Sequence, residues 1–383
     1  FKELAYNQRK KPFGSLAART LGDVYADTAQ GAKNGIELAF DTILKGRDGL
    51  THRQKVMNKY LNIVDVAPID GCDLITTIDV GMQDICEKAL VDKLKELNAT
   101  VGVVVLMEVA TGEVKAIVNM TQGRDGEYYE VRNNAISDML EPGSTFKTAS
   151  IMVALEDGKI TPDYIVDTGN GQKPMHGRVM KDHNWHRGGY GKLTVTEILG
   201  VSSNVGTSSI IENFYGSNPQ KFVDGLKRMS IDQPLHLQIS GEGKPNIRGP
   251  KERYFSKTTL PWMSIGYETQ VPPINILTFY NAIANNGVSI RPKFVKAAVR
   301  DGEVIKEYPT LAQIREILRK VVGEGLAKPA GSKQFHVSGK TGTAQVSQGA
   351  AGYKTGRTNY LVSFCGYFPS EEPKYSMIVS IQK

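Results

Sequence analysis

A serine and a lysine three residues apart, Ser144 and Lys147, are the first pair in this sequence that could do covalent chemistry. They follow Pro142 and Gly143, which interrupt a regular backbone, so we expect a helix to begin at or just before Ser144. On a helix, side chains three apart lie on one face within reach of each other. Because a serine hydroxyl attacks once a nearby base takes its proton, the spacing predicts a serine nucleophile with a lysine base.

The lysine can act as a base only if its pKa falls well below the ordinary value of roughly 10.4. Burial, the positive end of the helix and a second nearby cation would each lower the pKa of Lys147. A Ser-x-x-Lys match alone is weak, and an exposed serine beside a helix cap is its commoner interpretation. The pair therefore needs partners from elsewhere in the chain.

A second motif, Ser202-Ser203-Asn204, lies between two helical patterns. Its hydroxyl and amide groups could relay a proton and hydrogen-bond a peptide carbonyl. In isolation the same three residues are equally typical of a helix cap and turn.

A third motif, Lys340-Thr341-Gly342-Thr343, runs into a predicted strand that ends near Gln345. The lysine supplies the second cation, and the two threonine hydroxyls could bind a carboxylate. Glycine lets the strand approach a ligand or a neighbouring helix closely. A backbone N–H of this strand, together with that of the predicted nucleophile, could form an oxyanion hole.

The elements around these motifs predict an antiparallel sheet. Residues 74–78 are a β-branched run typical of a strand, and Asp79 can cap the helix that follows. Residues 101–109 and 113–118 are two strand-like runs joined by a short turn, which indicates a hairpin. The apolar positions of the helix follow the helical period at Met82, Ile85, Cys86, Ala89, Leu90, Leu94 and Leu97.

Helical patterns dominate the middle of the chain and strands return at its end. Thr194 and Glu197 have the spacing of a capping box. Strands, then helices, then strands again predict an α+β domain with a helical insertion. The expected helices are one following Ser144, one opening at Thr194, 205–215 and 311–326, and the expected late strands are 336–345, 360–368 and 375–382.

The first 68 residues differ in pattern from the rest, and we expect them to form a small accessory module. The charged stretch Lys45–Lys59 within them is expected to be an exposed linker or a helical arm. Residues 69–383 would then form the main domain.

The three motifs, in this order and in these settings, are those of the penicillin-binding and serine β-lactamase group. The chain resembles a class B penicillin-binding protein nearly from end to end. The resemblance extends to residues 141–147, 193–204, 266–273 and 340–345. In the front module, residues 14–22 and 35–41 resemble pedestal motifs, in which Arg19 and Glu37 would pair.

The resemblance implies an antiparallel sheet flanked by helices with a helical subdomain, and a pedestal formed by residues 1–68. It also implies a D,D-transpeptidase that crosslinks peptidoglycan stem peptides. Ser144 would attack the carbonyl between the two terminal D-alanines of a donor pentapeptide, and Lys147 would take its proton. Ser202 would help protonate the departing D-alanine, while Asn204 would hold the donor amide and orient the lysine base.

Residues of the third motif are implied in binding the donor. Lys340, Thr341 and Thr343 would bind the terminal carboxylate, and Gly342 belongs to the same subsite. The N–H groups of Ser144 and Thr343 would stabilise the oxyanion. An amine of a second stem would then accept the acyl group, and β-lactam antibiotics would acylate the serine as donor mimics.

The resemblance further implies a single-pass protein of the bacterial inner membrane with its catalytic domain in the periplasm. Its partners would be a membrane glycosyltransferase and division-complex proteins, with no nucleic acid, cofactor or metal. No apolar run in the sequence is long enough to span a bilayer, so we expect the anchor to be missing from this chain. Residues 14–22 and 266–273 favour the division-specific, FtsI-like branch over the elongation-specific one.

Composition leaves two questions open. The net charge is +7, and the basic residues are scattered, which favours a solvated surface over a site for an anionic partner. Three cysteines, Cys72, Cys86 and Cys365, fit no zinc pattern and cannot all be paired. Cys86 is expected to be a buried free thiol, with a Cys72–Cys86 disulfide as the alternative.

Other functions compete with transpeptidation. Asp182, His183 and His186 could share a metal, although a loop near the rim of the cleft is the more typical interpretation. A β-lactamase or β-lactam sensor would have the same three motifs, but no segment between Asn204 and Lys340 resembles the motif of the deacylating glutamate. A D,D-carboxypeptidase would use the same motifs with water as the acceptor, and a non-catalytic scaffold would not need them.

Overall fold

The main sheet has six antiparallel strands in the order β15-β16-β17-β4-β5-β6. The computed structural model describes residues 10–27, 30–300, 303–307, 326, 328–346 and 359–383. The predicted hairpin and the three predicted late strands are confirmed and lie in this one sheet. Its strands are β4 (Val101–Glu108), β5 (Val114–Gln122), β6 (Tyr128–Tyr129), β15 (Ser338–Gln345), β16 (Tyr360–Phe368) and β17 (Tyr375–Gln382).

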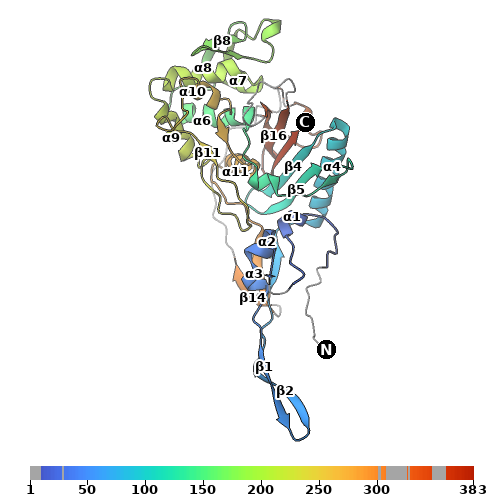
Figure 1. The fold of residues 1–383 in the computed structure, drawn as a ribbon. Coiled ribbons are helices and arrows are strands. Elements are labelled where there is room, and N and C mark those ends of the chain that lie inside the picture. The colour runs from blue at the N-terminus through green and yellow to red at the C-terminus, as the bar shows by residue number, and fades with distance from the viewer. Residues whose placement is uncertain (1–9, 28–29, 301–302, 308–325, 327, 347–358) are drawn as a thin grey trace.

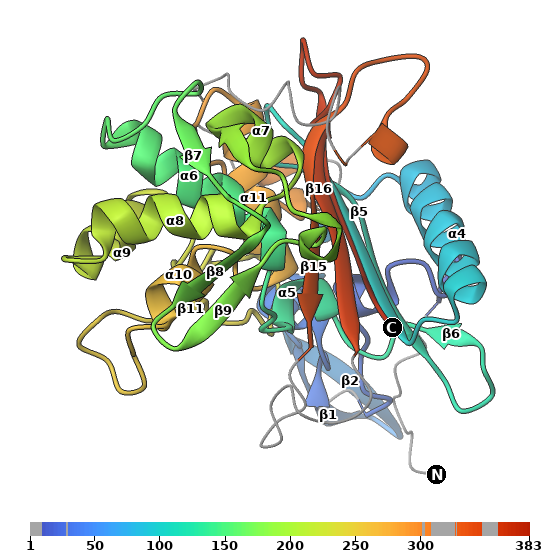
Figure 2. The same cartoon turned by 90° about the horizontal axis from the view of Figure 1, so that it is seen from above.

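Helices cover both faces of the sheet, as Figure 2 shows from above. The central strand β4 is almost continuously buried, because side chains from either face of it enter a core. One core lies under helix α4, and the other lies under the helices on the opposite face. The sheet therefore separates two apolar cores and holds its strands rigidly.

Helix α4 (Val80–Leu97) has the predicted N-cap, since the Asp79 carboxylate accepts the Met82 N–H at 2.8 Å. Its buried apolar positions include Leu90 and Leu94, and Ile85 was wrongly assigned to that face because it is 68% exposed. Cys72, Cys86 and Cys365 are free and buried, so the disulfide alternative is wrong.

The opposite face carries the helical subdomain. Helix α11 (Pro273–Ala284) packs directly on β17 and β16 and is buried on nearly every side. The capping box at the start of α7 is confirmed, with the side chains and N–H groups of Thr194 and Glu197 bonded reciprocally. The remaining helices are α5 (Asn134–Ser137), α6 (Lys147–Glu156), α7 (Val195–Gly200), α8 (Asn204–Tyr215), α9 (Pro219–Arg228) and α10 (Thr259–Met263).

Three short strand pairs connect these helices. All three pairs are antiparallel. The helix predicted for residues 311–326 lies almost wholly outside the described residues. The pairs are β7 (Ile165–Asp167) with β10 (Lys192–Thr194), β8 (Gln172–Met175) with β9 (Arg178–Lys181), and β11 (Asn246–Ile247) with β12 (Thr269–Gln270).

The N-terminal residues form a narrow stem below the body of the molecule (Figure 1). It contains α1 (Ala18–Leu21), α2 (Gly35–Ala39) and α3 (Asp41–Leu44), and ends in a hairpin of β1 (Leu50–Val56) and β2 (Lys59–Val66). The stretch expected to be a linker or helical arm is exposed as predicted, but the helical form is wrong. Its residues pair across the strands, from Thr51↔Val64 to Val56↔Lys59.

A later segment of the chain completes the stem. Strand β3 (Asp73–Thr76) pairs with β13 (Val295–Arg300), which also pairs with β14 (Glu303–Glu307). Residues far apart in sequence therefore share this small sheet. The boundary at residue 68 stays a prediction.

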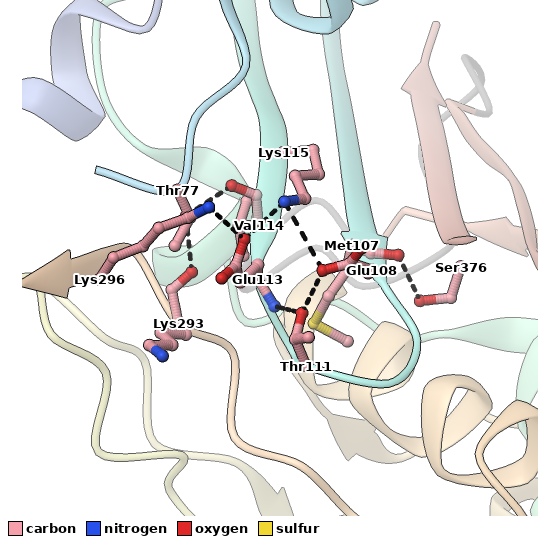
Figure 3. A network of polar contacts seen from close by, with 10 residues as sticks. All are labelled: Thr77, Met107, Glu108, Thr111, Glu113, Val114, Lys115, Lys293, Lys296 and Ser376. Atoms are coloured by element: carbon pink, nitrogen blue, oxygen red, sulfur yellow. Dashed lines mark hydrogen bonds and ion pairs between the residues drawn. The ribbon is translucent and has the colours of Figure 1, made fainter. Parts of the chain in front are cut away.

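A network of polar contacts joins this small sheet to the start of β5 (Figure 3). The buried Thr77 hydroxyl donates to the carbonyls of Val114 and Lys293 at 2.7 and 2.8 Å. Glu113, only 9% exposed, forms ion pairs with Lys115 at 2.5 Å and Lys296 at 3.0 Å. Burial would raise the pKa of the Glu113 carboxyl, but the two ammonium groups hold it below its ordinary value. The junction is thus a charged, largely buried joint.

Candidate active site

The predicted nucleophile lies in the first turn of a helix that the surrounding fold holds firmly. A 3-10 turn, η2 (Gly143–Phe146), leads directly into α6, so the helix begins where the sequence predicted. The Tyr280 hydroxyl on α11 donates to the Thr145 carbonyl at 2.9 Å. The Ser150 hydroxyl donates to the Ser264 carbonyl at 2.7 Å. Ser144 itself is partly exposed, as a nucleophile that meets a substrate must be.

Lys147 is completely buried and points toward the second motif. Its ammonium donates to the Ser202 carbonyl at 2.6 Å and to the Ser202 hydroxyl at 3.2 Å. Burial, followed by the charge of Lys340, holds the pKa of Lys147 well below its ordinary value, against the opposing effect of Asp182. Among the described residues, no hydrogen bond joins its ammonium to Ser144. The side chain nevertheless has the low pKa that a base needs.

Lys340, on β15, also donates a hydrogen bond to the Ser202 hydroxyl. It is 1% exposed, and its ammonium donates to the Ser202 hydroxyl and to the Thr341 carbonyl, both at 2.9 Å. Burial lowers the pKa of Lys340 to about 7. The structure therefore brings together Lys147, Ser202 and Lys340 from three separate parts of the chain.

The second motif forms the tight connection between α7 and α8. Ser202 has a left-handed backbone with φ of 55°, which is uncommon for a residue with a side chain. Ser203 caps α8 by accepting the Gly206 N–H at 2.8 Å. The Asn204 amide donates to the Lys181 carbonyl at 2.8 Å, and its expected roles toward a donor amide and the lysine base stay predictions.

The third motif lies alongside η2, in close contact with the nucleophile's turn. A Cβ atom on Gly342 would lie 2.8 Å from the Thr145 methyl carbon and 3.2 Å from the Pro142 carbonyl oxygen. A side chain at this position would push the strand away from the helix. Thr341 is partly exposed and Thr343 is exposed, so both are available to a ligand.

Gly143 and Gly266 are in close backbone contact next to the nucleophile. The Gly143 N–H donates to the Gly266 carbonyl at 3.1 Å, and Gly266 has φ of 86°. A Cβ on Gly266 would lie 2.1 Å from the Gly143 carbonyl oxygen, so only glycine fits there. The two glycines fix the backbone immediately before Ser144.

Two further residues connect this region, and sequence reasoning did not assign them a role. The Glu141 carboxylate accepts the Glu268 N–H at 2.8 Å, and the Tyr267 hydroxyl accepts the Gln345 N–H at 3.2 Å. Segment 266–273 and the family-like stretch 141–147 had been singled out, but only as resemblances. Their contact across the fold has no signature in local spacing.

The three residues of the metal alternative have separate partners. Asp182 is 1% exposed and accepts hydrogen bonds from Ser203 and Val205. His183 is hydrogen-bonded to the Tyr190 hydroxyl at 2.9 Å, and His186 packs edge-on against the Trp185 ring. In the described part of the chain, no three His, Cys, Asp or Glu side chains cluster closely enough to hold a metal ion.

The N-terminal module meets the main domain at Glu130. The Arg19 N–H donates to its carboxylate and the Arg19 guanidinium to its carbonyl, both at 3.0 Å. The expected pair between Arg19 and Glu37 stays a prediction. Within the described ranges, no helix is long and apolar enough to cross a membrane.

Comparison with known families finds one match over most of the chain. Residues 102–383 match the penicillin binding protein transpeptidase domain. Similar curated proteins include the peptidoglycan D,D-transpeptidase FtsI of Buchnera aphidicola, 26% identical over 98% of this chain and 66% of its own length. Another is the probable peptidoglycan D,D-transpeptidase PenA of Neisseria meningitidis, 28% identical over 98% of this chain and 64% of its own length. The chain thus spans slightly less than two thirds of these relatives.

Solved structures give the same fold. The apo form of penicillin binding protein 3 from Mycobacterium tuberculosis has a TM-score of 0.81 at 26% identity, over 98% of this chain and 84% of that one. Its complex with ampicillin has a TM-score of 0.82 at 26% identity, over 98% and 83% of the two chains. The family match over most of the chain, together with the converging motifs, shows that the chain belongs to the penicillin-binding protein transpeptidase family, as its resemblance to the class B proteins predicted.

Proposed function

We propose that this chain is a peptidoglycan D,D-transpeptidase that works through an acyl-enzyme on Ser144. The observation that carries the proposal is the convergence of two buried lysines on Ser202 beside the helix of Ser144. One lysine with a low pKa can act as a base while the other serves as a cation. The relatives named as D,D-transpeptidases support the same assignment.

In the first step, Ser144 Oγ attacks the carbonyl carbon between the two terminal D-alanines, and its proton moves to Lys147. The N–H groups of Ser144 and Thr343 hold the resulting oxyanion. The C–N bond then breaks, and the departing D-alanine amine takes a proton through Ser202. The product is a serine ester of the shortened stem and free D-alanine.

In the second step, a neutral amine of another stem attacks the ester carbonyl. The C–O bond to Ser144 breaks, the serine recovers a proton, and the amine loses one, so the peptide crosslink forms with no cofactor. Lys340, Thr341 and Thr343 bind the donor's terminal carboxylate before the first step. The buried lysine provides the charge, and the hydroxyls of the partly exposed Thr341 and the exposed Thr343 provide hydrogen bonds.

A β-lactam would enter as a donor mimic, because its strained amide and carboxylate take the places of the scissile bond and the terminal carboxylate. The ampicillin and aztreonam complexes of the related penicillin binding protein 3 support this part of the proposal. The alternative function is a β-lactamase or sensor of the same fold, in which water would release the acyl group.

The test is to expose the protein to a labelled penicillin and to map the adduct by mass spectrometry. A stable adduct on Ser144, absent in Ser144→Ala and retained in the exposed control Ser217→Ala, is the expected result. No adduct on a folded protein overturns the proposal. Rapid turnover of the label assigns the β-lactamase instead. Exchange of the terminal D-alanine of a synthetic donor for an added D-amino acid distinguishes transpeptidation from hydrolysis.

We further propose a septal role, with a membrane anchor outside this chain and the catalytic domain in the periplasm. The partners would be a membrane glycosyltransferase and division-complex proteins. The support is the FtsI name of two relatives, which are 26% and 29% identical to this chain. A fluorescent fusion of the full-length protein should gather at division sites. Even distribution along the side wall would favour the elongation-specific alternative.

A further inference from the structure

Asp182 is a buried carboxylate that accepts hydrogen bonds from the second motif and from the first turn of α8. It follows β9 directly and is 1% exposed. The Ser203 hydroxyl donates to its two oxygens at 3.0 and 2.9 Å, and the Val205 N–H donates to Oδ1 at 2.9 Å. The carboxylate therefore binds the middle residue of Ser202-Ser203-Asn204 and the first turn of α8.

The residue next to Ser203 needs such support. Ser202 has a left-handed backbone, which is strained for a residue with a Cβ atom. Its carbonyl and hydroxyl both accept from Lys147, and the hydroxyl also accepts from Lys340. A strained residue persists at a functional site when its surroundings fix it. The bonds from Ser203 to Asp182 are part of that fixation.

Asp182 also contributes charge to a region with two buried ammonium groups. Its carboxylate opposes the effects of burial and of Lys340 on the pKa of Lys147. Burial, followed by the charge of Asp182, raises the pKa of Tyr190. The Tyr190 hydroxyl is hydrogen-bonded to His183. The nearby Lys181 ammonium lies 4.0 Å from the Trp185 ring centroid.

We propose that Asp182 is a positioning residue for acylation, which fixes Ser202 through Ser203 beside the general base Lys147. The inference rests on the proposed function and deepens it. Asp182 touches neither the substrate nor the reacting atoms. It acts through the turn that carries the shared hydroxyl and through its charge.

The test compares Asp182→Asn and Ser203→Ala with the natural protein. The asparagine keeps an acceptor for the Val205 N–H but removes the charge. The alanine keeps the charge of Asp182 but removes its link to the turn, together with the cap that Ser203 provides for the Gly206 N–H. Asp157→Asn is the matched control, since Asp157 accepts from Tyr215 and Arg228 at the far end of α6. The second-order rate constant of acylation by a fluorescent penicillin is measured from pH 5 to 10.

In Asp182→Asn we expect the rising limb of the acylation rate to move to lower pH, because the base loses a stabilising negative charge. The plateau should fall at least about tenfold, since the base is weaker and the turn less well fixed. Ser203→Ala should lower the plateau of the acylation rate constant without shifting the rising limb of its pH profile. Asp157→Asn should change neither.

An Asp182→Asn profile that superimposes on that of the natural protein would overturn the inference. If that variant does not fold, an unchanged plateau in folded Ser203→Ala overturns it, and a lowered plateau supports it. Failure of the natural protein itself to be acylated at Ser144 would instead refute the proposed function. Active-site titration with the same penicillin separates the two failures.

Discussion

Lys147 and Lys340 donate to one shared acceptor, the Ser202 hydroxyl, at 3.2 and 2.9 Å. Burial and the charge of Lys340 disfavour protonation of Lys147, and burial disfavours protonation of Lys340. The pKa of Lys147 lies well below its ordinary value, and that of Lys340 is about 7. The arrangement makes one lysine available as a base at neutral pH while the other can still meet an anionic substrate.

The first prediction concerns Lys147. Replacing it with methionine keeps the length and apolar stem of the side chain but removes the base. Acylation by a labelled penicillin should slow by about 100-fold or more, because that is the usual contribution of a general base. Stopped-flow measurement of the acylation rate constant checks this result.

The same variant should still fold, although it loses the hydrogen bonds from Lys147 to the Ser202 carbonyl and hydroxyl. Thermal unfolding followed by circular dichroism provides that control. A loss of less than about tenfold in a folded protein would exclude Lys147 as the main base.

The second prediction concerns the pH dependence of carboxylate binding. An anionic donor prefers the protonated form of Lys340, whose pKa in the free protein is about 7. Affinity should therefore fall as pH rises through 7, approaching a tenfold loss for each further pH unit. Calorimetric titration of Ser144→Ala with a D-Ala-D-Ala peptide measures binding without acylation.

In the double variant with Lys340→Met, binding should be weak and should lose this dependence on pH. A peptide whose terminal carboxyl is amidated is the matched ligand control. Equal affinity at pH 6 and pH 9 in the protein with Lys340 would contradict the assigned role.

The third prediction concerns Gly266. Substitution by alanine would place a Cβ 2.1 Å from the Gly143 carbonyl oxygen, at a φ of 86°. We expect a loss of about 3 kcal/mol or more in the free energy of unfolding, from overpacking and backbone strain together. Denaturant unfolding measures this change.

Gly158→Ala is the matched control, because Gly158 also has a positive φ of 62° but no atom within 4 Å of the added Cβ. It should cost only about 1 kcal/mol, from the left-handed backbone alone. Equal losses in the two variants would mean that the contact with Gly143 is not restrictive.

The fourth prediction concerns the joint in Figure 3. Glu113→Ala leaves the Lys115 and Lys296 ammonium groups without their shared carboxylate. We expect the free energy of unfolding to fall by about 2 kcal/mol, since the mostly buried Lys115 ammonium then keeps only its longer contact with Glu108 at 3.6 Å.

The comparison is Glu127→Ala, which breaks the exposed pair between Lys95 and Glu127. In Glu127→Ala the free energy of unfolding should change by less than about 1 kcal/mol, as for other surface ion pairs. Should Glu113→Ala prove as mild as this control, the joint would not stabilise the fold.

The fifth prediction concerns Glu130 and the pH dependence of stability. Burial raises the pKa of the Glu130 carboxyl from 4.5 to about 7, so the folded protein binds a proton that the unfolded chain releases. Stability should therefore decline as pH rises from 4.5 to 7, by roughly 3 kcal/mol for this group. Unfolding by urea at a series of pH values measures the slope.

Glu130→Gln should remove this slope, because the amide does not titrate in that range. Glu127→Gln, at a mostly exposed carboxyl, is the control and should leave the slope intact. Identical slopes in the natural protein and Glu130→Gln would show that another group titrates there.

The sequence by itself determined the local elements of this protein. Helix α4 starts at its Asp79 cap, and the capping box at Thr194 forms because both patterns depend on contacts a few residues apart. Likewise Ser144 opens its helix after Pro142 and Gly143. The three motifs indicated the family by their order along the chain, because the residues of each motif lie within a few positions of one another and can be recognised in the sequence.

Sequence patterns failed where an element depends on distant partners. The charged stretch Lys45–Lys59 suits a linker or a helical arm, yet its residues 50–56 form a strand that pairs with residues 59–66. Ile85 follows the apolar period of α4 but faces solvent, since the period does not define the edge of the buried face. The free state of Cys72 and Cys86 depends on where the fold places the two thiols.

Only the tertiary structure decided how the motifs meet. Ser202 lies between two lysines from distant segments, and its left-handed backbone depends on the packing around it. Asp182 was a metal candidate by residue type and became a helix-capping carboxylate by position. The pKa of each lysine likewise depends on burial that no local pattern specifies. Residue type determines which chemistry is available, whereas burial and long-range contacts determine which charge states and partners that chemistry has.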